Sequence, residues 1–453
     1  MEGGQLALLF FAGIIHWCLF FNFGRMNFRA YDWPKEHAYY SVLRESLLNK
    51  SVPFHISSVF QDTNRFLALP ETNLLPHILL LPIMPVPAFI FAHILIMYSV
   101  GFLGCLFLKK HFGLGLIPFT FLYLLFNFNG YISSHIAVGH TMWSGYFLLP
   151  FFCLHTFKLT EKKEGGRRLV YKISFVLFLV GLAGAFHIYI WCAVFLLILG
   201  LSNPRCLRKS AGAVFLSAGC LLFRILPAAL TFWNKGYPYL FISGYPKPAD
   251  IINALMTAQN HEYFPFPSRM GWWEFDIYIG VIGAAVLFFY FFFARAARKE
   301  GIGGLTFREF DAALLLFLIF SLDIVFRPIA SLHIPLLNFQ RYSSRFIILP
   351  LLIALIVSAA RMQKMDFSRP ASKITACGWY FLAALLAASL FRHSFIWRIS
   401  GIEKKYPFAP LPQVTIAQQP DRMYISLLAV SSAASLAFII FTFHSAFTRK
   451  NLK

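Results

Sequence analysis

Apolar residues occur in runs of about twenty along most of this chain, and short polar loops separate the runs. A helix of about twenty residues rises about 30 Å, which matches the hydrocarbon core of a bilayer. The pattern therefore predicts an all-α, polytopic bundle of about twelve transmembrane spans. These predicted spans are 5–23, 88–108, 113–129, 139–157, 172–186, 188–202, 210–229, 276–294, 309–326, 345–361, 374–391 and 423–446.

Composition supports a membrane protein, because 58% of the 453 residues are hydrophobic and only 13% are charged. Soluble domains carry roughly a quarter charged residues. The net charge of +21 comes largely from Lys and Arg in short loops, such as 158–172, 205–209, 295–299 and 361–373. These loops alternate with basic-poor ones, as expected of cytoplasmic loops. The charge therefore predicts a plasma-membrane or inner-membrane topology with both termini in the cytoplasm, and no nucleic-acid partner.

Three longer polar intervals fall on the predicted outer face, at 24–76, 230–275 and 392–421. We expect residues 1–360 to form one transmembrane catalytic module that contains the first two of them. Residues 361–453 are expected to form a C-terminal transmembrane hairpin around the third. No internal repeat is visible in the sequence.

The first outer loop contains the segment YYSVLRESLLNK, which places Tyr40, Leu43 and Leu47 on one face of a helix. Such a helix suits the membrane surface better than a membrane crossing. The following interval, 73–89, contains four prolines, so a kinked or re-entrant entry to the second span is expected.

Asp32, in the segment YDWPKEH, is the carboxylate that we single out in this loop. An ionised carboxylate can take a proton from a hydroxyl group, which is the role of a general base. The alternative is that Asp32 is solvated or caps the helix that begins near Pro34. Glu36 lies one helical turn further on and could support Asp32, or pair with Lys35.

Two further groups of polar residues lie at predicted outer ends of spans. His135 and His140 occupy a short turn before the fourth span, where they are either hydrogen-bonded structural residues or part of a site. No further ligands accompany them, so no metal site is expected. Arg341 and Arg345 lie at the entrance of the tenth span, where they could bind a phosphate or lipid headgroups.

The order of these features resembles the class C glycosyltransferase superfamily (GT-C), which comprises polytopic enzymes that use polyprenyl-phosphate-linked sugars. Three stretches are similar to bacterial multipass proteins of the lipoteichoic-acid-glycosylating type. They are VGHTMWSGYFLLPFF at 138–152, WWEFDIYIG at 272–280 and LLNFQRYSSRFIILPLLIAL at 336–355. With the Asp32 loop, the resemblance covers most of residues 1–360, whereas the chain beyond about residue 370 resembles no family that we can name.

The resemblance implies that Asp32 is the general base and that Arg341 and Arg345 bind the phosphate of the donor. It also matches His140 to a recurring Gly-His pair at the fourth span. Many members of the superfamily have two adjacent acidic residues in the first loop, whereas Asp32 is followed by Trp33. A divalent metal at this position is therefore possible but not supported, and we expect no cofactor.

These observations predict an integral-membrane glycosyltransferase. It would move a sugar from a polyprenyl-phosphate donor to a hydroxyl of an extracytoplasmic glycan, lipid or protein. A transporter or flippase for lipid-linked glycans, or a glycan polymerase, remains as an alternative. A transporter usually has ionisable residues at mid-membrane depth, and Arg224 is the main candidate for such a residue here.

Overall fold

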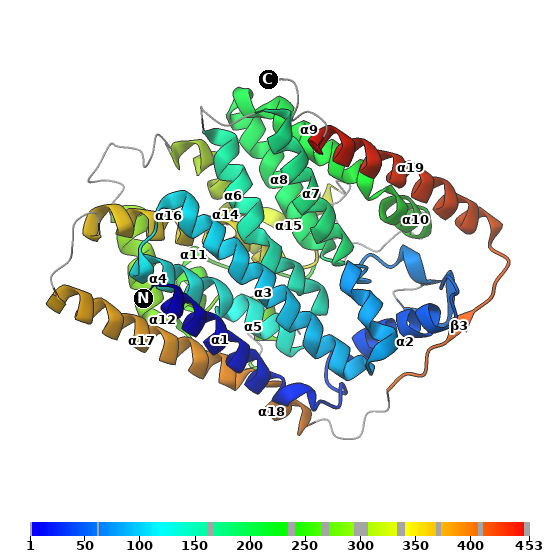
Figure 1. Ribbon diagram of the computed structural model, residues 1–453, viewed down its shortest axis with the longest axis horizontal. Coiled ribbons are helices and arrows are strands. Elements are labelled where there is room, and N and C mark those ends of the chain that lie inside the picture. Colours follow the sequence, from blue (N-terminus) through cyan, green and yellow to red (C-terminus); the bar gives the residue numbers. More distant parts are fainter. Residues whose placement is uncertain are drawn as a thin grey trace.

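The protein is mostly helical in the computed structural model (Figure 1), as the sequence predicts. The described residues are 2–60, 63–161, 166–233, 241–263, 271–293, 307–332, 340–367, 373–405 and 411–447. Parts of the second and third outer loops, and the basic residues Arg295, Arg298 and Lys299, lie outside these ranges.

The α-helices follow one another from end to end of the chain. They are α1 (Glu2–Phe20), α2 (Trp33–Leu48), α3 (Val86–Phe112), α4 (Leu116–Asn127), α5 (Gly130–Ala137), α6 (Leu149–Thr160), α7 (Arg167–Leu182), α8 (Phe186–Ser202), α9 (Pro204–Cys220), α10 (Leu222–Trp233), α11 (Pro248–Met256), α12 (Gly280–Leu287), α14 (Asp311–Phe320), α15 (Asp323–Ser331), α16 (Ile348–Asp366), α17 (Lys373–Ile396), α18 (Ile399–Glu403) and α19 (Arg422–Phe447). Short 3₁₀ segments include η3 (Pro76–Ile83), η4 (Thr141–Leu148), η5 (Trp272–Glu274) and η8 (Ser343–Ile347).

Six helical segments among the described residues are long and apolar enough to cross a membrane. A seventh is obtained if α9 and α10, which meet at an angle of 76°, are counted as one span. The predicted count of twelve is therefore not confirmed. Several predicted spans are interrupted, for example 309–326, which is divided into α14 and α15.

Burial separates central from peripheral helices. The most apolar stretch of the segment that includes α16 is 100% buried, and that of the α4–α5 segment is 89% buried. In α1 and α17 the corresponding value is 17%, and large apolar side chains there are exposed. A helix that is apolar on all sides and unburied suits contact with lipid, so these outer helices support the prediction of a membrane protein.

The start of α1 and the end of α3 lie together at one end of the bundle. Lys109 near the end of α3 forms an ion pair of 2.6 Å with Glu2 at the start of α1. Figure 1 shows α2 at the opposite end of α1 and α3, beside a small sheet. The first loop therefore gathers at one end of the bundle, away from the start of α1.

A three-stranded antiparallel sheet was not predicted. Its strands are β1 (His55–Phe60), β2 (Thr63–Arg65) and β3 (Ile416–Ala417), in the order β2-β1-β3. Because β3 belongs to the third loop, the sheet ties the third loop to the first (Figure 1). One hydrophobic core also contains residues on both sides of the predicted division at 360.

Two local predictions have different outcomes. The proline-rich interval 73–89 does form a break, with η3 ending before α3 begins. The predicted short polar turn before the fourth span is wrong, because residues 130–137 form the buried helix α5. Asn129 starts this helix by accepting a hydrogen bond from the Ile132 backbone N–H at 3.3 Å.

Candidate functional site

Asp32 precedes α2, which begins with Trp33 and Pro34. Proline fits the first turn of a helix because its missing N–H would have no intrahelical partner there. Asp32 holds the N-cap position, but its side chain makes no capping hydrogen bond. The capping interpretation of Asp32 is therefore wrong. Its side chain is 43% exposed, so the carboxylate is open to a substrate.

Lys35 connects Asp32 to a second carboxylate. Its ammonium Nζ donates to Asp32 Oδ2 at 2.9 Å and to Glu71 Oε2 at 2.8 Å. The three side chains are partly exposed, at 43% for Asp32, 20% for Lys35 and 15% for Glu71. A fixed cation therefore lies between two carboxylates that come from separate segments of the first loop.

Glu71 is held in place through its backbone. Arg224 Nη2 donates to the carbonyl oxygens of Pro70 and Thr72, both at 2.7 Å. On the other side lies Gly184, whose φ is +74° and where a Cβ atom would come within 2.2 Å of the Glu71 carbonyl oxygen. Arg224, the candidate mid-membrane ionisable residue, thus fixes the segment that carries Glu71.

The two histidines do not lie in an exposed turn. His135, in α5, is fully buried, and His140 follows it with little exposure. His140 Nε2 lies 3.5 Å from Asp32 Oδ2, and the Nδ1 atoms of His135 and His140 are 2.9 Å apart. The structure therefore brings both predicted histidines together next to Asp32, with His140 between His135 and the Asp32 carboxylate.

The backbone at Gly139 makes this arrangement possible. The Asp32 N–H donates to the Val138 carbonyl at 3.1 Å, and the Trp33 indole donates to the Ala137 carbonyl at 3.0 Å. Gly139 has a φ of +91°, and a Cβ atom there would lie 2.5 Å from the Trp33 backbone nitrogen. Only glycine lets the two segments approach so closely without strain.

Gly139→Ala is therefore expected to destabilise the protein by about 2–5 kcal/mol, from backbone strain and overpacking together. Gly113→Ala is the matched control, since Gly113 has a φ of +62° and nothing within 4 Å of a Cβ atom. It should cost only about 1–2 kcal/mol of strain. Thermal unfolding in detergent measures both, and equal losses would contradict the close approach at Gly139.

Burial and charge act on these carboxyl groups in different ways. Burial raises the pKa of Asp32, but the Lys35 ammonium and the hydrogen bond from His140 outweigh it and hold that pKa well below its usual range. The pKa of Glu71 is also lowered, because Lys35 lowers it by more than burial raises it. Both groups are ionised at neutral pH, and their contribution to stability is lost only as the pH falls into the acid range.

Glu36 is different because it is almost completely buried. Its Oε2 accepts a hydrogen bond from Thr141, and its Oε1 lies 3.9 Å from Lys35 Nζ. Burial raises the pKa of Glu36 to about 8, although Lys35 and Thr141 act in the opposite direction. Glu36 is therefore protonated at neutral pH, beside two ionised carboxylates, and supports Asp32 only through Lys35.

We expect the stability of the protein to fall as the pH rises from about 4.5, the ordinary value for Glu36, to about 8. A raised folded-state pKa stabilises the fold only while the group stays protonated. Glu36→Gln should remove this decline, which amounts to a few kcal/mol at about 1.4 kcal/mol per unit. Unfolding temperatures at several pH values measure it. An unchanged decline in the variant would show that another group causes it.

The two predicted arginines have different surroundings. Arg345 is buried, and its Nε and Nη2 donate to Glu274 at 2.6 and 2.7 Å. Its guanidinium charge is thus already neutralised within the protein. Arg341 is exposed, and its side chain forms no ion pair with any described residue. An anion arriving from outside would therefore find its free cation at Arg341 rather than at Arg345.

His187, at the start of α8, is close to the Lys35–Glu71 pair and also to the arginines Arg341 and Arg345. It lies within electrostatic range of Glu71 as well as of Arg341 and Arg345. Its Nδ1 is 3.2 Å from the Gln340 side-chain oxygen, next to Arg341 in the chain. The polar cluster therefore extends from Asp32 through Lys35 and Glu71 to His187 and Arg341.

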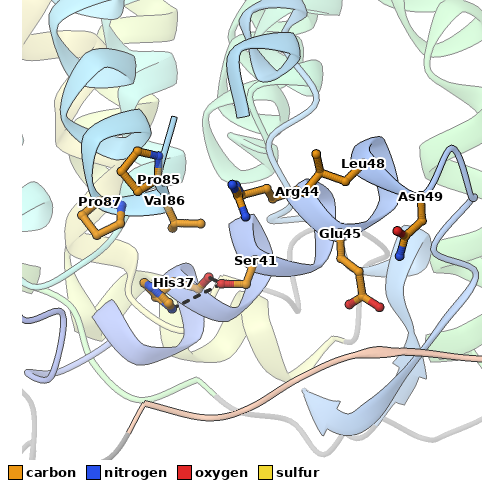
Figure 2. A pocket seen from close by; sticks show the side chains of 9 residues that line it. All are labelled: His37, Ser41, Arg44, Glu45, Leu48, Asn49, Pro85, Val86 and Pro87. Carbon is orange, nitrogen blue, oxygen red and sulfur yellow. Dashed lines mark hydrogen bonds between the residues drawn. The ribbon is translucent and has the colours of Figure 1, made fainter. Parts of the chain in front are cut away.

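A separate groove of about 470 Å³ lies on another side of α2, against the start of α3. Figure 2 shows His37, Ser41 and Arg44 of α2 facing Pro85 and Val86 across it. Neither Asp32, Glu71 nor His140 lines this groove. Glu45 is the one carboxylate among its lining residues, so this groove is separate from the polar cluster around Asp32.

Lys35, Glu71, His187 and Glu274 belong to the site but were not assigned to it from the sequence. Glu274 lies in the stretch WWEFDIYIG, and Glu71 was one of the acidic residues of the first loop. Both residues are visible as carboxylates in the sequence, but nothing in the sequence indicated which cation each of them would pair with. Among the described residues, no three His, Cys, Asp or Glu side chains gather to hold a metal ion.

Comparisons with family models, with curated proteins and with solved structures found no match for this chain. The resemblance to the class C glycosyltransferases therefore stays a prediction.

Proposed function

We propose that the protein is a membrane glycosyltransferase that moves a sugar from a polyprenyl-phosphate donor to a hydroxyl group. The observation that carries this proposal is the polar cluster at one end of an apolar bundle. It combines an ionised Asp32, whose side chain is 43% exposed, with an exposed Arg341 that forms no ion pair with any described residue. A base for the acceptor and a cation for the departing phosphate are the two groups that such a transfer needs.

In the reaction, the acceptor oxygen forms a bond to the anomeric carbon of the sugar. The bond from that carbon to the phosphate oxygen breaks, and its electron pair leaves with the phosphate towards Arg341. The acceptor hydroxyl loses its proton to Asp32. Lys35 and His140 make Asp32 a weak base, which suits a late proton transfer, when an oxocarbenium-like carbon has already made the hydroxyl acidic.

Lys35 and Glu71 would keep the Asp32 carboxylate ionised and oriented. Arg345 cannot act as a free cation while Glu274 holds it, so we assign the phosphate to Arg341. With one general base and no carboxylate assigned as a nucleophile, the proposed transfer inverts the configuration of the anomeric carbon. Twelve spans and the GT-C fold belong to this proposal as well.

The experiment uses the purified full chain in lipid vesicles with a panel of polyprenyl-phosphate sugars. Release of free polyprenyl phosphate in the presence of an alcohol acceptor or a cell-envelope glycan is the measured signal. We expect release with at least one donor. If no donor is cleaved but a lipid-linked glycan crosses the bilayer of sealed vesicles, the protein is a flippase and the proposal is wrong.

A further inference from the structure

The groove between α2 and the start of α3 has room for a ligand. Its volume is about 470 Å³, and binding sites for small molecules usually enclose about 300–1,000 Å³. One wall is formed by α2 and the other by Pro85, Val86 and Pro87 (Figure 2). None of the residues assigned to the proposed transfer lines it, so its use has to be sought elsewhere.

The groove lies at the level of the lipid headgroups. The helix α3 has 27 residues and is therefore about 40 Å long. This length is close to the thickness of a bilayer with its headgroups, about 40–45 Å. Its last turn contains Lys109 and Lys110, so its first turn, which lines the groove, lies in the opposite headgroup layer. A groove at this depth meets the polar ends of membrane lipids.

Exposed apolar side chains flank this groove. Leu48, at the end of α2, lines it and is 51% exposed. Leu79 and Ile83, in η3, are 67% and 78% exposed. The segment η3 lies beside the groove, because the Leu81 carbonyl accepts a hydrogen bond from Arg44 Nε at 3.1 Å. Large exposed apolar side chains next to the headgroup layer suit contact with acyl chains.

Arg44 supplies a cation to the groove. Its bond to Leu81 occupies only Nε, and no residue that the structure describes forms an ion pair with Arg44. Figure 2 shows its guanidinium extending towards α3, whereas the Glu45 carboxylate extends away from it. Glu45 Oε2 accepts a hydrogen bond from the Ile416 N–H at 3.2 Å instead. The two outer nitrogens of Arg44 therefore remain for an anion, and the guanidinium fork matches the oxygens of a phosphate.

We propose that this groove binds a membrane phospholipid, with the phosphate on Arg44 and the acyl chains against Leu48, Leu79 and Ile83. Such a site is separate from the proposed transfer and would exist whether or not the protein is a transferase. A free phosphate would pair with Arg44 but leave the apolar side chains uncovered. A neutral lipid would cover them but leave Arg44 without an anion. A phospholipid does both, and because it would contact α2 as well as α3, its binding should stabilise the folded protein.

The test uses the purified full chain in detergent after its lipids have been washed away. Phosphatidylglycerol, diacylglycerol with the same acyl chains, and inorganic phosphate are added separately at equal concentrations. Native mass spectrometry measures bound lipid, and the unfolding temperature measures stabilisation. Phosphatidylglycerol should bind and raise the unfolding temperature, whereas diacylglycerol and inorganic phosphate should each have a much smaller effect.

Arg44→Gln should weaken the binding of phosphatidylglycerol by about 10–100-fold, because it removes the charged donors to the phosphate. Arg25→Gln is the matched control. Arg25 is exposed in the same predicted outer loop but does not line the groove. This control variant should bind phosphatidylglycerol as the wild type does.

Ser41→Trp tests the groove while leaving Arg44 in place. Ser41 lines the groove, and its hydroxyl bonds only to His37, one turn earlier in α2. The indole should fill part of the groove, so lipid binding should fall as it does in Arg44→Gln. The unfolding temperature measured without lipid should stay close to that of the wild type, which separates loss of binding from loss of folding.

Four results would overturn the proposal. If Arg44→Gln and Ser41→Trp bind phosphatidylglycerol as tightly as the wild type, the groove is not the site. If diacylglycerol binds as tightly as phosphatidylglycerol, the phosphate is not recognised. If inorganic phosphate alone gives the full rise in unfolding temperature, and Arg44→Gln abolishes that rise, the site holds a free anion. If polyprenyl phosphate displaces phosphatidylglycerol at a lower concentration, the groove holds the lipid carrier of the donor instead.

Discussion

Asp32→Asn should lower the rate of donor cleavage by about 10²–10⁴-fold, the usual contribution of a general base. Asparagine keeps the shape of the side chain and one acceptor oxygen, but it cannot take the acceptor's proton. Because the Asp32 side chain is 43% exposed and the Lys35–Glu71 pair remains, the variant should fold as the wild type does. The measurement is the initial rate of polyprenyl-phosphate release, with the unfolding temperature recorded on the same samples.

Glu45→Gln is the matched control for Asp32→Asn. Glu45 lies on α2, which Asp32 precedes, and it lines the separate groove. It accepts a hydrogen bond from the Ile416 N–H, which glutamine can also accept. Its rate should stay within about twofold of the wild type. If Asp32→Asn also stays within that range, Asp32 is not the base, and Glu71→Gln is the next variant to measure.

The second large effect concerns the buried ion pair between Glu274 and Arg345. Glu274→Leu leaves the Arg345 guanidinium, which is 6% exposed, without a counter-charge. Removing one partner of a buried pair typically costs about 3–5 kcal/mol. We therefore expect a large fall in the unfolding temperature, measured by intrinsic fluorescence in detergent or lipid.

Two comparisons isolate the cause. The double variant Glu274→Leu/Arg345→Met should recover most of the lost stability, because two apolar side chains can replace a buried ion pair at little cost. Arg327→Gln disrupts the pair with Asp323, in which Arg327 is 57% exposed, and should cost no more than about 1 kcal/mol. Equal losses for Glu274→Leu and Arg327→Gln would contradict the buried-pair interpretation.

Features that depend on neighbouring residues could be predicted from the sequence. The apolar runs predicted a helical membrane protein, and the prolines in 73–89 predicted the break before α3. The polar segment around α2 drew attention to Asp32, because a carboxylate next to Trp33 and Pro34 stands out in an apolar chain. Helix period, proline geometry and membrane thickness are local or uniform constraints, so a single sequence contains them.

Features that depend on pairing between distant residues could not be predicted. Lys35 and Glu71 are 36 residues apart, and Glu274 and Arg345 are 71 apart. No local pattern indicated that Arg345 would be neutralised while Arg341 forms no ion pair with any residue that the structure describes. The buried state of His135 was also missed, because its polar neighbours in the sequence suggested a turn.

The sequence by itself predicted a helical membrane protein with a carboxylate in its first polar loop, and the long apolar helices agree with that prediction. The tertiary structure decided which charges are paired, which are buried and which remain available to a ligand. The physical reason is that the free energy of a charge depends on burial and on its partners in space. Lys35 beside Asp32 and Glu274 beside Arg345 became partners only when the chain had folded.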